Sequence, residues 1–200
     1  MPKYFNNFPK LAYTNPQATT IVTDILTRVA LVKGAIDNTS IYYHYDIQDG
    51  DTPEMIASKY YNDPELHWVV LIFNNIIDPF YDWPLSYQQF IKHLTDKYGS
   101  IPTAQSQIHH YEKIVETTDG YSGETTTKIY QIDQTAYNAL VPSTVNTTVG
   151  GFSVSIVTSK RIIYTYDYEL ELNESKRRIN LVRRELINEV KKQFIELMSA

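Results

Sequence analysis

The chain has 200 residues, with 18 basic and 23 acidic side chains and a formal net charge of −5. This acidic balance argues against a dedicated nucleic-acid-binding protein, which usually carries a basic surplus. The absence of cysteine excludes disulfides, thiolate zinc sites and cysteine nucleophiles. The 17 tyrosines favour a protein with extensive contact surfaces, because tyrosine combines apolar area with a hydrogen-bonding tip.

The placement of apolar residues argues against export and membrane insertion. Residues 1–10 have no apolar core of the kind that a secretory signal needs, so we expect no signal peptide. The longest strongly hydrophobic stretch, residues 68–77, is too short to cross a bilayer and contains two asparagines. We therefore expect no membrane contact. The seven glycines are also not placed to form a phosphate-binding loop.

Residues 1–40 predict an N-terminal arm followed by a short helix. The first 20 residues contain three prolines and no hydrophobic period, which favours an extended arm. Four aromatic side chains within its first 13 residues favour an arm that packs on something, with a frayed terminus as the alternative. Residues 21–33 carry apolar side chains at helical spacing, and Gly34 suits the end of such a helix.

Residues 41–99 predict a strand followed by three helical stretches. The β-branched and aromatic run 41–48 is typical of a strand, and Asp49-Gly50 is a turn signal. Thr52 before a proline predicts the start of the first helix, with Asp51 as a second capping register. A second helix runs from near Pro64 to the asparagines at 74–75, and a third spans residues 86–98.

Residues 100–170 change in character and predict two or more β-hairpins. The β-like runs are residues 108–115, 128–132, 152–157 and 161–170. The Thr/Ser/Gly-rich stretches between them, residues 116–127 and 143–151, predict mobile loops. The alternating tyrosines of residues 163–168 favour a strand with one solvated face.

Residues 171–200 predict a long amphipathic helix. The expected apolar stripe follows helical spacing, and the opposite face is largely basic. A helix of about 28 residues would extend roughly 42 Å, longer than a compact domain of this size covers. We expect it to dock on another chain, with docking on the chain's own β-module as the alternative. The stripe comprises Ile179, Val182, Leu186, Val190, Phe194 and Leu197.

No constellation of catalytic or metal-ligating residues is evident. None of the five histidines has metal-ligand spacing, and His109 and His110 should point to opposite sides of a strand. The carboxylates of Asp49, Asp51 and Glu54 have a sufficient structural role in the turn and the helix cap. We therefore expect no catalytic residues, no metal and no cofactor, and do not expect an enzyme.

The segment from Tyr45 to Leu85 resembles a LysM module. The resemblance rests on the run 45–52 with its Gly50-Asp51-Thr52 loop, on Ile56-Ala57-Ser58-Lys59-Tyr60, and on Phe73-Asn74. It implies a small βααβ fold in which a return strand follows the second helix. LysM modules bind N-acetylglucosamine polymers such as peptidoglycan. A glycan would then lie between the 50–52 loop and the 74–77 loop.

The sequence departs from glycan-binding LysM modules after the second helix. The residues Tyr60, Pro64-x-Leu66-x-Trp68, Asn74 and Asp78-Pro79-x-Tyr81-x-Trp83 are similar to the LysM-like baseplate wedge subunits of contractile-tailed phages, the gene product fifty-three family. This resemblance covers about residues 20–85, and the 160–200 region resembles relatives more loosely. It implies a non-catalytic structural protein of the virion tail baseplate, made in the host cytoplasm.

The resemblance also implies partners and contact residues. The partners would be other baseplate wedge proteins and proteins near the central hub and tail tube. Trp68, Tyr81 and Trp83 would be partly core and partly partner contact, and the stripe of the last helix would pack on neighbouring wedge proteins. The alternatives are a peptidoglycan-binding LysM protein of a tail lysin, with a vestigial glycan site in the wedge protein itself, and an enzyme.

The expected fold class is α+β. It combines a LysM-like βααβ module, a β-hairpin region and a long C-terminal amphipathic helix. The expected divisions are an arm and short helix at 1–40, a LysM-like module with a following helix at 41–99, a β-rich region at 100–170 and the last helix at 171–200.

Overall fold

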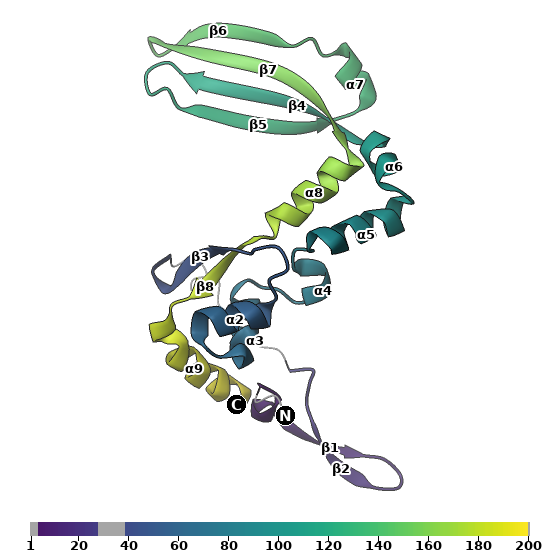
Figure 1. Cartoon of the computed structure of the whole chain (residues 1–200). Helices are drawn as coiled ribbons and strands as arrows, with labels where there is room; N and C mark the ends of the chain where they lie inside the picture. The colour runs from purple at the N-terminus through teal and green to yellow at the C-terminus, as the bar shows by residue number, and fades with distance from the viewer. Residues whose placement is uncertain (1–3, 28–38, 200) are drawn as a thin grey trace. The chain divides into compact units, whose positions relative to one another are not determined.

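The computed structural model of the chain describes residues 4–27 and 39–199 (Figure 1). It mixes helices and strands, which confirms the expected α+β class. The chain divides into two compact units, unit 1 from Met1–Tyr87 and Asn173–Ala200 and unit 2 from Gln88–Leu172. None of the described helices is long and apolar enough to span a bilayer.

The elements of unit 1 come from both ends of the chain. They are η1 (Tyr4–Asn7), β1 (Lys10–Thr14), β2 (Thr19–Thr23), η2 (Thr39–Ile41), β3 (Tyr42–Asp46), α2 (Pro53–Tyr61), η3 (Pro64–Leu66), α3 (His67–Phe73), α4 (Pro79–Asp82), β8 (Arg178–Val182), η4 (Arg184–Leu186) and α9 (Ile187–Ser199).

Two antiparallel strands and two helices enclose the core of unit 1. β3 pairs with β8 from Tyr42↔Val182 to Asp46↔Arg178. The expected order of strand, helix, helix and strand therefore holds only when β8 is the second strand. The return strand expected shortly after Asn74 is absent from the described residues, which continue there into α4 and α5. The buried core comprises Ile47, Ile56, Ala57, Leu66, Val69, Val70, Phe73, Trp83, Ile179, Leu181, Val182 and Ile187.

The predicted single helix over residues 171–200 is interrupted by a strand: residues 171–175 are helical, as the end of α8 (Thr165–Ser175), but the segment after them is not. Residues 178–182 form strand β8, and α9 begins only at Ile187. Ile179 and Val182 do lie in an apolar cluster, but the cluster is the core beneath a two-stranded sheet. Pairing with β3 decides the backbone here, because tertiary context overrides a weak helical preference in a β-branched segment. The 13-residue α9 extends only about 20 Å.

The predicted start of the first helix is confirmed. Thr52 is the N-cap of α2, and its side chain accepts a hydrogen bond from the Met55 N–H. Pro53 occupies the first helical position, where no N–H is needed. Asp51 does not take the second capping register, because its carboxylate accepts hydrogen bonds from Tyr45 and Gln48 instead.

The N-terminal region forms a β-hairpin that includes part of the expected extended arm and the first residues of the expected short helix over 21–33. β1 and β2 pair antiparallel from Lys10↔Thr23 to Thr14↔Thr19, so residues 21–23 are extended. The β-branched run Thr19–Thr23 favours a strand over a helix. The remainder of the predicted helix, from residue 28 onward, lies outside the described residues.

Unit 2 consists of a four-stranded antiparallel sheet and of helices that precede, connect and follow its strands. The strand order is β5-β4-β7-β6. The predicted third helix of the 41–99 region is confirmed as α5, which ends before Gly99 in the left-handed conformation (φ +82°). The elements are α5 (Tyr87–Tyr98), α6 (Ile101–Ser106), β4 (Ile108–Asp119), β5 (Thr125–Ile132), α7 (Gln134–Ala139), β6 (Ser143–Val149), β7 (Phe152–Tyr164) and α8 (Thr165–Ser175).

Two predicted loops are strands of this sheet. Residues 143–149 form β6, and the 116–127 stretch is mostly the paired ends of β4 and β5 around a tight turn. Their threonines and valines are β-branched and fit a pleated strand, so composition alone misled the prediction.

The predicted strand over 161–170 is wrong beyond Tyr164. α8 begins at Thr165, whose hydroxyl donates to the Ala104 carbonyl at 2.6 Å. Thr165 and Glu169 are both buried and lie four residues apart, which is a helical repeat of polar side chains. The tyrosines of residues 163–168 alternate with a period of two, which is typical of a strand, and this alternation led to the wrong prediction.

Candidate interaction surfaces

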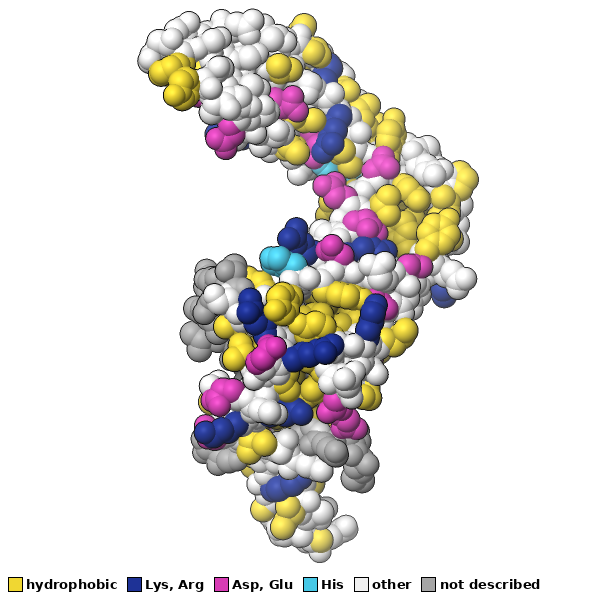
Figure 2. All heavy atoms as spheres, turned by 60° about the vertical axis from the view of Figure 1, so that its left-hand side comes forward, with side chains coloured by type: hydrophobic (Ala, Val, Ile, Leu, Met, Phe, Trp, Pro, Cys, Tyr) yellow, Lys and Arg dark blue, Asp and Glu magenta, His cyan; other side chains and the backbone are white. Residues whose placement is uncertain are grey.

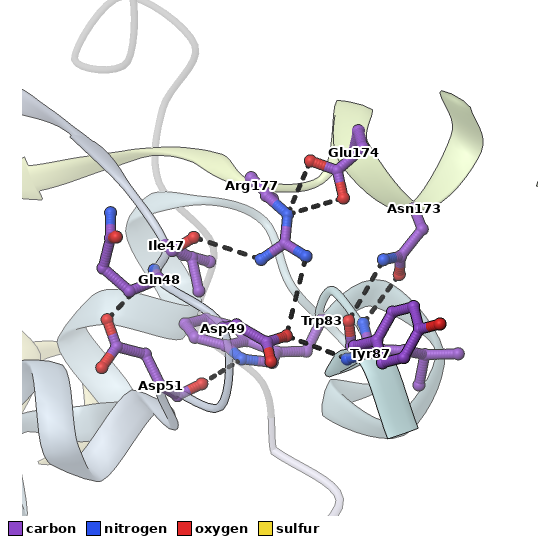
Figure 3. Close-up of polar contacts among 10 residues, drawn as sticks. Ile47, Gln48, Asp49, Asp51, Trp83, Tyr87, Asn173, Glu174 and Arg177 are labelled. Atoms are coloured by element: carbon purple, nitrogen blue, oxygen red, sulfur yellow. Dashed lines mark hydrogen bonds and ion pairs between the residues drawn. The ribbon is translucent and has the colours of Figure 1, made fainter. Parts of the chain in front are cut away.

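The loop expected to mark a LysM module is held by the chain's own residues (Figure 3). Gly50 adopts a positive φ of 82°, which a glycine tolerates without steric cost. The Asp51 carboxylate accepts hydrogen bonds from the Tyr45 hydroxyl at 2.8 Å and the Gln48 N–H at 3.1 Å. The Trp83 indole N–H donates to the Asp51 carbonyl at 2.9 Å. Gly50, Asp51 and Thr52 therefore have structural roles.

A second set of contacts ties the same loop to the C-terminal segment. Arg177 donates to the Glu174 carboxylate at 2.7 Å and to the Ile47 carbonyl at 3.3 Å, and its guanidinium lies 3.9 Å from the Asp49 carboxylate. The Tyr87 N–H donates to the same carboxylate oxygen, Asp49 Oδ1, at 2.9 Å. Figure 3 shows these groups converging on the 47–51 backbone. Sequence analysis missed Arg177, because nothing in the local pattern marks a partner 130 residues away.

The segment after α3 presents apolar side chains to solvent, which we call the α4 surface (Ile77, Phe80 and Tyr81). Their exposed fractions are 68%, 87% and 77%. The backbone beneath them is fixed, because Asp78 caps α4 through the Phe80 N–H at 2.9 Å and Asp82 accepts from the N–H groups of residues 77 and 78. The Asp-Pro pair at 78–79 is an N-cap signature that marks this short helix in the sequence.

The predicted contact residues are mostly buried within the chain. Trp83 is 8% exposed, and Ile179, Val182 and Phe194 are buried as well. Leu186 and Val190 are half-buried against the main core. Only Tyr81 and Leu197, which is 60% exposed, face solvent among the predicted set.

Trp68 lies half-buried in an aromatic cluster that joins the N-terminus to α9. Its ring lies 4.5 Å from Phe194 and 5.7 Å from Tyr4, measured between centroids. Phe8 is buried in the same cluster. The N-terminal arm therefore packs on unit 1 through η1, while the β1–β2 hairpin beyond it remains exposed.

Basic side chains lie over tyrosine rings on the β3, α2 and β8 side of unit 1. The Arg183 guanidinium lies 4.8 Å from the Tyr43 ring centroid, and that of Arg184 lies 5.0 Å from Tyr60. Lysine and arginine side chains border hydrophobic ones on the face shown in Figure 2. Such pairs stabilise by about 0.5–1 kcal/mol at exposed sites, so they are weak as interface anchors.

Unit 2 contains two buried carboxylates with cationic partners. Glu169 accepts hydrogen bonds from Lys97 at 2.6 Å and the Tyr98 hydroxyl at 2.7 Å. Burial opposes ionisation of Glu169, but these hydrogen bonds outweigh it and lower its pKa. Glu112 is likewise buried, and hydrogen bonds from Arg161 and His110 lower its pKa against the same opposing effect.

The two adjacent histidines do not diverge as predicted. His109 Nδ1 and His110 Nδ1 lie 2.7 Å apart, at the register shift between Ile108 and His110 that interrupts the strand alternation. No cluster of three metal-ligating side chains occurs among the described residues. Glu112 and Glu169, the two buried carboxylates among the described residues of unit 2, each have a cationic partner within the unit.

Two comparisons with known proteins bear on these surfaces. The baseplate wedge protein gp53 of Enterobacteria phage T4 is 32% identical over 65 residues, which are 32% of this chain and 33% of that protein. The match therefore spans about a third of the curated relative's length. The family described as base plate wedge protein 53 matches residues 4–197, nearly the whole chain. The chain therefore belongs to the base plate wedge protein 53 family.

Proposed function

We propose that this chain, as a structural component of the phage tail baseplate, docks onto a neighbouring wedge protein through the α4 surface. Its family membership supports the baseplate role. The observation that carries the contact is the exposure of Phe80 and Tyr81 at 87% and 77% on a fixed backbone. Rigid aromatic side chains are typical anchors of protein interfaces, because little conformational entropy is lost when they are covered.

The same proposal includes a second contact at the C-terminus. A protein that joins wedge proteins to each other and to the hub or tail tube needs more than one contact surface. Leu197 on α9 is 60% exposed, while Phe194 on the same helix is buried in the chain's own aromatic cluster. The outer side of α9 therefore supports a role as the second contact, with the inner side fixing the helix in place.

The contact is tested by incorporation into tail particles that are assembled without the native chain. The double variant Phe80→Ser with Tyr81→Ser should lower incorporation at least about tenfold, since each aromatic anchor contributes about 2 kcal/mol or more. The matched control is Val141→Ser, because Val141 is 76% exposed in unit 2. Wild-type incorporation of the double variant, with the thermal melt unchanged, would refute the contact.

A Leu197→Ser variant tests the second contact separately. Its expected phenotype is incorporation with a weakened attachment, measured as loss of the chain from particles during a salt wash. Purified peptidoglycan serves as the negative probe, because the carboxylate of Asp51 and the hydroxyl of Thr52 are engaged by the chain itself. Sedimentation of the wild-type chain with cell wall would favour the glycan-binding alternative.

A further inference from the structure

The sheet of unit 2 has one apolar face. Residues directly opposite each other on neighbouring strands project from the same face. The register places Thr117, Ile156 and Val145 side by side across three strands, and Val149 opposite Phe152. Counting alternate residues from these pairs places six apolar residues on this face, with Thr117, Thr147 and Thr158 among them. We call the six the apolar sheet face: Val115, Val145, Val149, Phe152, Val154 and Ile156.

The opposite face has fewer apolar side chains, with Ile114, Ile129 and Val157 among mostly hydroxyl-bearing and charged residues. Glu112 and Arg161 form an ion pair on it. The edge strand β6 contributes only polar residues to this side, namely Thr144, Asn146 and Thr148. An antiparallel sheet with one apolar and one polar face normally packs its apolar face against another layer.

Unit 2 itself covers only the two ends of this face. At one end the Tyr121 ring lies 4.9 Å from the Phe152 ring, measured between centroids. At the other end Tyr137 of α7 packs on Tyr111 with ring centroids 4.7 Å apart, and its carbonyl accepts from Lys160 at 2.7 Å. Beyond these residues no described element of unit 2 forms a covering layer. Val145, Val149 and Phe152 are 54%, 63% and 49% exposed, and none of the six residues of the apolar sheet face is buried.

Three lysines lie on the same face. Lys160 donates to the Tyr137 carbonyl, and the other two, Lys113 and Lys128, indicate the charge of a partner that covers the face. Lys113 stands opposite Tyr130, and Lys128 stands opposite Val115. Neither lysine is ion-paired to a carboxylate in the part of the chain that the structure describes. A second copy of the face would add more positive than negative charge, because its paired strands carry three lysines and a single carboxylate, that of Asp119.

We propose that the apolar sheet face docks a different protein of the tail baseplate, whose contact surface carries aliphatic or aromatic side chains beside carboxylates. The charge complementarity selects this occupant over a second copy of the chain. The proposal rests on the baseplate role proposed above, but it uses a surface in unit 2 that is separate from the α4 surface.

Site-specific photo-crosslinking in assembled particles tests the occupant. Phe152→p-benzoylphenylalanine places the probe on the apolar sheet face, and Thr148→p-benzoylphenylalanine places it on the opposite face of the neighbouring edge strand. The expected result is a crosslink from position 152 to another baseplate protein and none from position 148. A product of two copies of this chain, or no product from position 152 in particles that contain the chain, would overturn the proposal.

Matched substitutions test the energetics. Val145→Thr with Val149→Thr keeps β-branching but lowers apolar area, and should reduce incorporation about tenfold. The control is Ile129→Thr, because Ile129 is 51% exposed but projects from the opposite face. Lys113→Glu with Lys128→Glu should reduce incorporation and remove its dependence on salt. Wild-type behaviour of both double variants would overturn this proposal and leave the baseplate role intact, whereas failure of the wild-type chain to incorporate would refute that role.

Discussion

The side chain of Asn74 joins the end of α3 to strand β8 in unit 1 by hydrogen bonds to the backbone of both. Its side-chain amide donates to the carbonyl oxygens of Val70 at 2.7 Å and Asn180 at 2.9 Å. Its Oδ1 accepts from the Asn180 N–H at 2.7 Å. The substitution Asn74→Ala removes all three bonds and leaves both backbone groups of Asn180 without their partner.

The expected loss of stability follows from those three groups. A buried polar group that loses its partner costs about 1–3 kcal/mol. Asn180 is half-buried, so water replaces part of the loss and the lower end of that range applies. We therefore expect Asn74→Ala to lower the free energy of unfolding of unit 1 by about 2–4 kcal/mol.

Urea unfolding followed by tryptophan fluorescence measures this change selectively. Both tryptophans, Trp68 and Trp83, belong to unit 1, so their emission reports that unit. Asn188→Ala on the exposed side of α9 is the control, and its effect should stay within about 0.5 kcal/mol. A loss below about 1 kcal/mol for Asn74→Ala would show that the amide bridge does not hold β8 in place.

Three further outcomes follow from the described contacts. Thr52→Ala removes the N-cap of α2 and should cost about 1 kcal/mol in the same urea assay. Trp83→Ala empties a buried core position and should cost about 3–5 kcal/mol, a shift that a control at exposed Tyr81 should not reproduce. The pKa of Glu169 and Glu112 is lowered on folding, so their stabilising contribution is present above the pKa of an unfolded carboxyl and is lost as pH falls through the folded value. Near-UV circular dichroism during acidification should show wild-type unit 2 losing stability more steeply than a Glu169→Gln variant, and equal slopes would contradict the stated charge pairing.

Between Pro53 and Gly99, local signals predicted helices α2, α3 and α5 well. The Thr-Pro pair at 52–53 marks a helix start through a cap and a missing N–H, both of which act within four residues. Asn74 at the end of α3 and Gly99 at the end of α5 also act locally. Such signals can be read from a sequence because the capping residue and the helix end that it stabilises lie within a few residues of each other.

Long-range pairing explains what the sequence did not reveal. Residues 178–182 carry apolar side chains that fit a helix or a strand, and only β3, more than 130 residues earlier, decides between them. The apolar sheet face was missed for a related reason. Its threonine-rich strands have the composition of loops, and their alternation becomes meaningful only once the register across β4, β7 and β6 is known.

The candidate site residues that were predicted from the family motif include both exposed and buried ones. Tyr81 was identified from a family motif and is exposed, whereas Trp83 in the same motif is buried and bonded to the Asp51 carbonyl. A motif states which residues occur together, but it does not state which of them face inward. The neighbouring Phe80, the most exposed aromatic of the α4 surface, was not singled out because it is not part of the motif.

The pairing of β3 with β8 also imposes an order on biosynthesis. His44 and Asn180 are hydrogen-bonded partners separated by 136 residues, and all of unit 2 lies between them. At about 5–20 residues per second, a ribosome takes roughly 7–27 s to supply the second strand after the first. All of unit 2 is synthesised before β8 and can fold first. Until β8 is synthesised, β3 has no partner strand on the edge that β8 later occupies. A prematurely terminated chain therefore lacks the strand that completes unit 1.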